Sequence, residues 1–177
     1  FEQIYEWLRS VDEARQRQVI RALADSYDID MSATCHDLMR GWDEIAALAA
    51  DPLIAIGARS KAHYEISKLA PKKALSEMAG SADIIEDRLG RRPVHFSFPY
   101  GDETAARARD FALAKEAGFK TAVTTRRGML FPAHRRFLTA LPRVPLAGDY
   151  QSLACTVLYL SGTTFAFRNR FQQVSAA

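Results

Sequence analysis

The feature that most constrains this chain is an alternation of short apolar runs and longer amphipathic stretches that begins at Leu53. Four runs have the length and composition of buried strands: Leu53–Ala58, Val94–Phe98, Lys120–Thr124 and Leu138–Val144. Helical stretches follow the first two runs and the connections are short, which favours a parallel sheet or barrel with right-handed crossovers. We therefore predict an α/β fold with mainly parallel strands.

Helix signals mark the stretches between and after these runs. Pro71 stands where a first helical turn tolerates the missing N–H, and the pattern predicts one long helix from there to about Leu89, ended by Gly90. The apolar spacing predicts helices over three further ranges: Thr104–Ala117, Asp149–Leu160 and Thr163–Phe171.

Residues 1–51 carry only helical signals. Ser10–Glu13 reads as a capping box, Asp30 can cap a helix that runs through Leu38, and the pattern of Trp42–Ala50 stops at Asp51-Pro52. We predict one domain over residues 1–177, with a helical N-terminal lead-in over 1–51 and strand–helix alternation over 52–177.

Composition excludes several classes of protein. Lys and Arg number 24 against 21 Asp and Glu, a formal charge of +3, and no basic stripe carries interleaved aromatics, so we expect no nucleic-acid partner. No run is long enough for a membrane span and no signal peptide is visible, which leaves cytoplasm and cell envelope both open. Cys35 and Cys155 lie far apart and are expected to be free thiols. The chain begins with Phe1 rather than Met, so we expect it to be processed, truncated or a fragment.

Polar and turn residues follow the first two apolar runs at the point where each predicted strand ends. These segments are Ile56–His63 and Phe96–Gly101. In α/β folds the carboxyl ends of parallel strands form the edge where ligands bind and chemistry takes place. We therefore expect the functional residues to lie in these two segments.

The two segments resemble the second and third motifs of the polysaccharide deacetylases, a family that includes the chitooligosaccharide deacetylases of nodulation. The resemblance runs from about Trp42 to the C-terminus. It implies a partial or distorted (β/α) barrel and the metal-assisted hydrolysis of N-acetyl groups on an acetylated amino-sugar oligomer or polymer. It also implies that this chain is the C-terminal portion of the domain. The family's first strand and its Asp-Asp motif have no counterpart here, and that missing N-terminal part is an expected partner.

The resemblance bears directly on a metal site. The family writes its second motif as His-Ser/Thr-x-x-His, and both histidines hold a divalent metal such as zinc. Here Arg59 occupies the first position and His63 the second. A lone imidazole holds zinc weakly and a guanidinium repels a cation, so we expect metal binding to be weak or absent. The plain alternative is that His63 is a hydrogen-bonded loop histidine.

The substrate pocket is implied by the second segment. In the family this loop lines the acetamido group, and the backbone N–H at the position of Tyr100 helps to bind the oxyanion. Arg143 stands where the family has a general-acid histidine; it cannot donate a proton at neutral pH, although it can face a developing negative charge. The substrate-binding candidates are Ser97, Pro99, Tyr100 and Gly101. A simple Pro-Tyr-Gly turn and a surface arginine are the plain alternatives.

Three functions remain open on the sequence. The first is a carbohydrate deacetylase homologue whose activity is doubtful in this chain, because Arg59 replaces a metal ligand and the Asp-Asp motif is missing. The second is an inactive homologue that binds carbohydrate through the remaining pocket. The third is a structural or interaction fragment whose exposed edge strand pairs with a partner.

Overall fold

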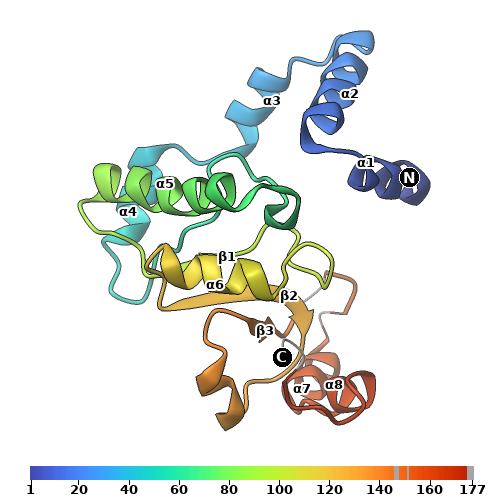
Figure 1. Ribbon diagram of the computed structural model, residues 1–177, viewed down its shortest axis with the longest axis vertical. Coiled ribbons are helices and arrows are strands. Elements are labelled where there is room, and N and C mark those ends of the chain that lie inside the picture. The colour runs from blue at the N-terminus through green and yellow to red at the C-terminus, as the bar shows by residue number, and fades with distance from the viewer. Residues whose placement is uncertain (146–147, 151, 175–177) are drawn as a thin grey trace. The chain divides into compact units, whose positions relative to one another are not determined.

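A computed structural model describes residues 1–145, 148–150 and 152–174 (Figure 1). The chain divides into two compact units, Phe1–Ala55 and Ile56–Ala177. The boundary falls close to residue 52, where the sequence pattern changes from helical to alternating. Among the described residues, no helix combines the length and the apolar character that crossing a bilayer would require.

The first unit is helical, as predicted. Its helices are α1 (Glu2–Ser10), α2 (Glu13–Ser26), α3 (Met31–Leu38) and α4 (Trp42–Ala49). Asp30 caps α3, because its Oδ1 accepts hydrogen bonds from the backbone N–H groups of Ser32 and Ala33 at 2.8 and 3.0 Å.

The predicted capping box at Ser10–Glu13 is wrong in its capping residue. Ser10 is the last residue of α1, and its hydroxyl donates to the carbonyl of Trp7 at 2.7 Å. Asp12 caps α2 instead, since its Oδ1 accepts from the N–H groups of Ala14 and Arg15 at 3.0 and 2.9 Å. A carboxylate at this position also interacts favourably with the helix dipole, which a serine hydroxyl does not.

The second unit is built on an open parallel sheet of three strands in the order β1–β2–β3. Their bounds are β1 (His95–Ser97), β2 (Thr121–Arg127) and β3 (Leu141–Arg143). Ala58 adds one parallel bridge beside β1: its N–H donates to the carbonyl of His95 at 2.8 Å, and its carbonyl accepts from the N–H of Ser97 at 2.9 Å. All four segments therefore run in the same direction.

The predicted strand Leu53–Ala58 is wrong over most of its length. Only Ala58 pairs with β1, and residues 51–53 form a turn. Leu53 is 92% exposed, so its apolar side chain does not mark a buried strand. An apolar run this short does not by itself distinguish a strand from an irregular segment.

Helices and short 3₁₀ turns connect and follow the strands. They are η1 (Ile66–Lys68), α5 (Pro71–Leu89), α6 (Ala108–Glu116), η2 (Pro132–Arg136), η3 (Gly148–Tyr150), α7 (Leu153–Leu160) and α8 (Thr163–Arg168). Helix α5 confirms both predicted ends, with Pro71 at its start and Gly90 as a left-handed cap at φ +69°. Helix α6 begins later than predicted, because Asp102 accepts from the N–H groups of Thr104 and Ala105 and holds them in a turn.

An aromatic cluster forms the centre of the second unit's core. Phe96 of β1 packs against Phe98 and Phe119 with ring centroids 5.1 and 4.9 Å apart, and Phe98 packs in turn against Phe111 of α6 at 5.5 Å. Figure 1 shows α5 and α6 close together, and α6 contacts β2. The core therefore joins β1, where the two segments singled out in the sequence meet, to the helices that support it.

We predict that Phe96→Ala lowers the free energy of unfolding by about 3–5 kcal/mol, because it empties a fully enclosed ring site and removes two aromatic contacts. Urea denaturation followed by circular dichroism measures the change. The matched control is Phe167→Ala, which removes a ring that is 70% exposed and should shift stability by less than about 1 kcal/mol. Equal losses in the two variants would contradict this account of the core.

Candidate functional site

The carboxyl ends of the parallel segments bring three predicted residues to one edge of the sheet. Arg59 follows Ala58, Ser97 is the last residue of β1, and Arg143 is the last residue of β3. Arg59 lies 38 positions before Ser97 in the sequence, and Arg143 lies 46 positions after it. Only the parallel pairing of the strands makes these residues neighbours. This edge is where α/β folds place their ligands.

Two guanidinium groups meet on one hydroxyl oxygen at this edge. Nη1 of Arg59 donates to Oγ of Ser97 at 3.0 Å, and Nη2 of Arg143 donates to the same oxygen. Since both nitrogens touch one atom, they lie within about 6 Å of each other. At a separation of about 5 Å, two unit positive charges repel by on the order of 1–3 kcal/mol, depending on exposure to solvent.

The electrostatics of Arg59 reflect this crowding. Burial lowers the pKa of its guanidinium, the charge of Arg143 lowers it further, and the phenol of Tyr100 acts in the opposite direction. Nε of Arg59 is buried and makes no hydrogen bond within the described part of the chain. No carboxylate among the described residues forms an ion pair with Arg59 or Arg143.

The loop after β1 is a tight turn anchored to β2. Pro99 is buried, and Tyr100 and Gly101 both have positive φ, at +60° and +69°. The hydroxyl of Thr125 donates to the carbonyl of Tyr100 at 2.6 Å, and its N–H donates to the carbonyl of Gly101 at 2.9 Å. A Cβ at Gly101 would lie 2.8 Å from the backbone nitrogen of Thr125, so glycine is required both by conformation and by space.

His63 lies at the same edge and faces Tyr100. Its ring meets the Tyr100 ring edge-on, with centroids 5.4 Å apart and planes at 69°. The side chain is exposed, and the backbone is left-handed at φ +57°. The segment from Arg59 to His63 is not helical, so its i and i+4 side chains do not share a helix face.

Glu77 holds this segment in place and was missed by the sequence argument. It lies buried on α5, where its Oε2 accepts from the N–H of Ala62 at 3.0 Å and its backbone carbonyl accepts from the N–H of Lys61 at 3.3 Å. A charged residue in the middle of a helix reads as a solvent-facing position, and no local pattern distinguishes it. Its buried carboxylate accepts one loop N–H and its backbone carbonyl accepts another.

The donor set at this edge does not fit a divalent metal. Within residues 1–145, 148–150 and 152–174, no three His, Cys, Asp or Glu side chains come together as a metal cluster. His63 supplies one imidazole at this edge, and the groups that meet at Ser97 are two guanidinium cations, which have no lone pair to offer a metal.

Two other histidines of the second unit, His95 and His134, make contacts outside this cluster. Nδ1 of His95 contacts Oγ1 of Thr121 at 2.8 Å, and the buried His134 has Nδ1 3.0 Å from the backbone nitrogen of Phe131. Cys35 and Cys155 are free thiols, as predicted. His95 and His134 thus add no ligand to the edge formed by Arg59, Ser97 and Arg143.

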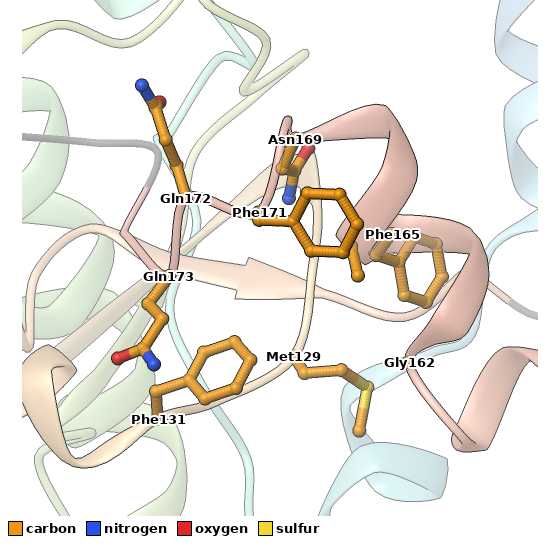
Figure 2. Close-up of a pocket in the computed structure, with 9 residues that line it drawn as sticks. Met129, Phe131, Gly162, Phe165, Asn169, Phe171, Gln172 and Gln173 are labelled. Carbon is orange, nitrogen blue, oxygen red and sulfur yellow. The ribbon is translucent and has the colours of Figure 1, made fainter.

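A separate cavity of about 220 Å³ lies between the segment after β2 and α8. Figure 2 shows its apolar walls, which come from Met129, Phe131, Phe165 and Phe171. The polar side chains that line it are amides, and Nδ2 of Asn169 already donates to the carbonyl of Arg127 at 3.0 Å. The cavity offers no nucleophile, acid or base, so the strand edge remains the candidate site.

In a comparison with protein families, residues 11–122 match the family described as polysaccharide deacetylase. This is more than half of the chain. The match begins ahead of Trp42, where the motif resemblance begins, and ends within β2. A search of curated protein sequences finds no match.

Two solved structures share the fold. Streptococcus pyogenes deacetylase PplD in complex with acetate is 19% identical with a TM-score of 0.52, over 58% of this chain and 43% of that chain. The structure of IcaB from Ammonifex degensii is 20% identical with a TM-score of 0.54, over 67% of this chain and 52% of that chain. This chain thus spans about half the length of either. The likeness confirms the predicted fold, a partial α/β barrel with parallel strands and a helical N-terminal start.

We predict that Gly101→Ala destabilises the protein more than Gly90→Ala does. Both glycines have φ +69°, which costs an alanine about 1–2 kcal/mol, but a Cβ at Gly90 meets no atom within 4 Å. The clash with Thr125 should add at least about 1 kcal/mol at Gly101. Thermal unfolding of the two variants measures the difference, and equal midpoints would show that the turn yields to the extra carbon.

We predict that Arg59→His raises zinc affinity at least about tenfold, because it removes a repelling charge and adds an imidazole four residues before His63. Competition with a fluorescent zinc indicator measures the affinity. Arg59→Gln is the matched control, since it removes the charge without adding a ligand and should gain less. His63→Ala in the Arg59→His background should reverse the gain; if it does not, His63 is no part of a metal site.

Proposed function

Since the chain belongs to the polysaccharide deacetylase family, we propose that residues 1–177 form the C-terminal portion of a carbohydrate deacetylase domain and contribute its pocket for an acetylated amino sugar. The chain is a deacetylase homologue, and its family is generally metal-dependent. In the proposal the ligand is an oligomer or polymer with N-acetyl groups, bound at the carboxyl edge of the sheet. The chain binds this ligand without hydrolysing it by the metal-dependent route.

One observation carries this proposal: Arg59 and Arg143 both donate to Ser97 at the strand edge. The resemblance in the motifs puts a metal histidine at the position of Arg59 and a general-acid histidine at that of Arg143. Neither guanidinium can bind a metal or release a proton at neutral pH. Both the expected ligand and the expected acid are therefore replaced by fixed positive charges.

The turn at Pro99–Gly101 is the proposed contact with the acetamido group. Its backbone is held rigidly by Thr125, so the N–H of Tyr100 would reach the acetamide oxygen without further ordering. The rings of Tyr100 and His63, in edge-on contact, would offer an apolar face to the sugar. These groups bind and orient a ligand; they transfer no proton.

A second candidate is hydrolysis by a larger assembly. This chain spans about half of the deacetylase structures that share its fold, and a segment with paired aspartates would add the acidic ligands that the described edge lacks. In that case the present chain would be the pocket-bearing part of an active enzyme. Assaying the chain together with such a segment, supplied on the same or a separate polypeptide, distinguishes the two candidates.

We predict saturable binding of N-acetylglucosamine oligomers, with fully deacetylated oligomers bound about tenfold more weakly because the acetamido hydrogen bond is lost. Isothermal titration calorimetry measures both ligands. Tyr100→Ala keeps the backbone N–H but removes the ring that would face the sugar, so it should weaken binding of the acetylated oligomer, while Tyr150→Ala, at an exposed tyrosine outside the turn, should not.

The same protein should release no acetate from these oligomers in the presence of zinc. An enzymatic acetate assay with a boiled control measures this directly. Release that depends on zinc and on His63 would overturn the non-hydrolytic part of the proposal. Failure to bind any acetylated oligomer would overturn the pocket itself.

A further inference from the structure

The cluster of Arg59, Ser97 and Arg143 concentrates positive charge without an acidic partner among the described residues. Both guanidinium groups turn toward the same neutral oxygen, although like charges repel at this range. Exposed arginines usually spread into solvent or pair with carboxylates. Here the fold of three separate strands directs two of them to one point.

A neutral hydroxyl occupies the position that suits an oxyanion. Guanidinium groups bind carboxylate and phosphate oxygens through charge-assisted hydrogen bonds, which are shorter and stronger than those to a neutral acceptor. Ser97 Oγ accepts from both cations, but it carries no charge to balance them. An anionic oxygen at this place would reverse the sign of the local interaction from repulsion to attraction.

The site is open to such a ligand and built on rigid elements. Arg143 is exposed and Arg59 is half-buried, so one cation faces solvent and the other forms the floor. Ser97 and Arg143 are strand residues, and Arg59 follows the bridge at Ala58. Charged groups held by strands keep their spacing when a ligand binds, which lowers the ordering cost.

We propose that Arg59, Ser97 and Arg143 form a binding site for an oxyanion carried by a sugar, so that the ligand of this chain is an acidic saccharide. The two guanidinium groups donate to the oxyanion, and the hydroxyl of Ser97 turns to donate a third hydrogen bond. The anion site stands on these contacts alone; only the saccharide as its carrier rests on the proposed function. A carboxylate and a phosphate ester share this chemistry, and the experiment separates them.

The test compares glucuronate, glucose 6-phosphate and neutral glucose by titration calorimetry or by chemical-shift titration. At least one acidic sugar should bind at least about tenfold more tightly than glucose, and added salt should weaken it. The stronger of the two acidic sugars identifies the oxyanion. Equal binding of all three sugars, or no binding of either acidic sugar, would overturn the proposal.

Variants assign the effect to the cluster. Arg143→Gln, at an exposed position, should reduce affinity for the preferred acidic sugar at least about tenfold and leave glucose unaffected. Arg91→Gln removes an exposed arginine outside the cluster and should leave both unchanged. If the two variants behave alike, the binding is general surface attraction and the site does not exist.

A second measurement follows thermal unfolding without and then with the preferred acidic sugar. In low-salt buffer Arg143→Gln should raise the unfolding midpoint or leave it unchanged, because it removes a repulsion, and saturating acidic sugar should raise the midpoint of the parent protein only. A clearly lowered midpoint without ligand would contradict the repulsion. If the protein binds neutral acetylated oligomers but shows no preference for acidic sugars, this inference is refuted and the proposed function stands. If it binds acidic sugars but no neutral acetylated oligomer, the proposed function alone is refuted.

Discussion

The parallel alignment of four chain segments is the constraint on which this site depends. Ala58, β1, β2 and β3 run in one direction, joined by hydrogen bonds such as that from the N–H of Ala58 to the carbonyl of His95. Parallel pairing requires a crossover between neighbours, and it places every strand's carboxyl end at the same edge. The aromatic core formed by Phe96 and its neighbours stabilises that alignment by packing the strands against α6. Residues far apart in the sequence thereby become one site.

Much of this fold could be predicted because its signals are local. Pro71 begins α5 because its ring fixes a helical φ, and Gly90 ends it because a residue without Cβ tolerates a positive φ. Asp30 caps α3 by accepting hydrogen bonds from the N–H groups of Ser32 and Ala33. The positions of Arg59 and Tyr100 at strand ends could be predicted in the same way. By contrast, the apolar run from Leu53 led to a wrong prediction of a strand, because a short apolar run without periodicity does not show whether the segment pairs with another strand.

The contacts that give the site its chemistry could not be predicted, since none of them is local. The sequence shows an arginine where a histidine is expected, but not that Arg59 and Arg143 converge on Ser97 across two strands. Nor does it show that Glu77 of α5 turns inward to hold the loop before His63. Such contacts are set by register and helix placement, which tertiary packing decides. The positive φ of His63 could not be predicted either, because glycine is the residue type that indicates this conformation in a sequence.

Arginine at positions where the motif resemblance places histidine would change the preferred ligand without disturbing the scaffold. The backbone makes the hydrogen bonds of the sheet, and other residues form the hydrophobic core. Side chains at the strand ends therefore contribute little to the stability of the sheet. Neutral imidazoles at such an edge attract a cation, whereas two guanidinium groups repel one and attract an anion. One fold can therefore support ligands of opposite charge, and the function must be argued from the side chains at the edge rather than from the fold. In this chain those side chains are Arg59, Ser97 and Arg143, and their net charge favours an acidic partner.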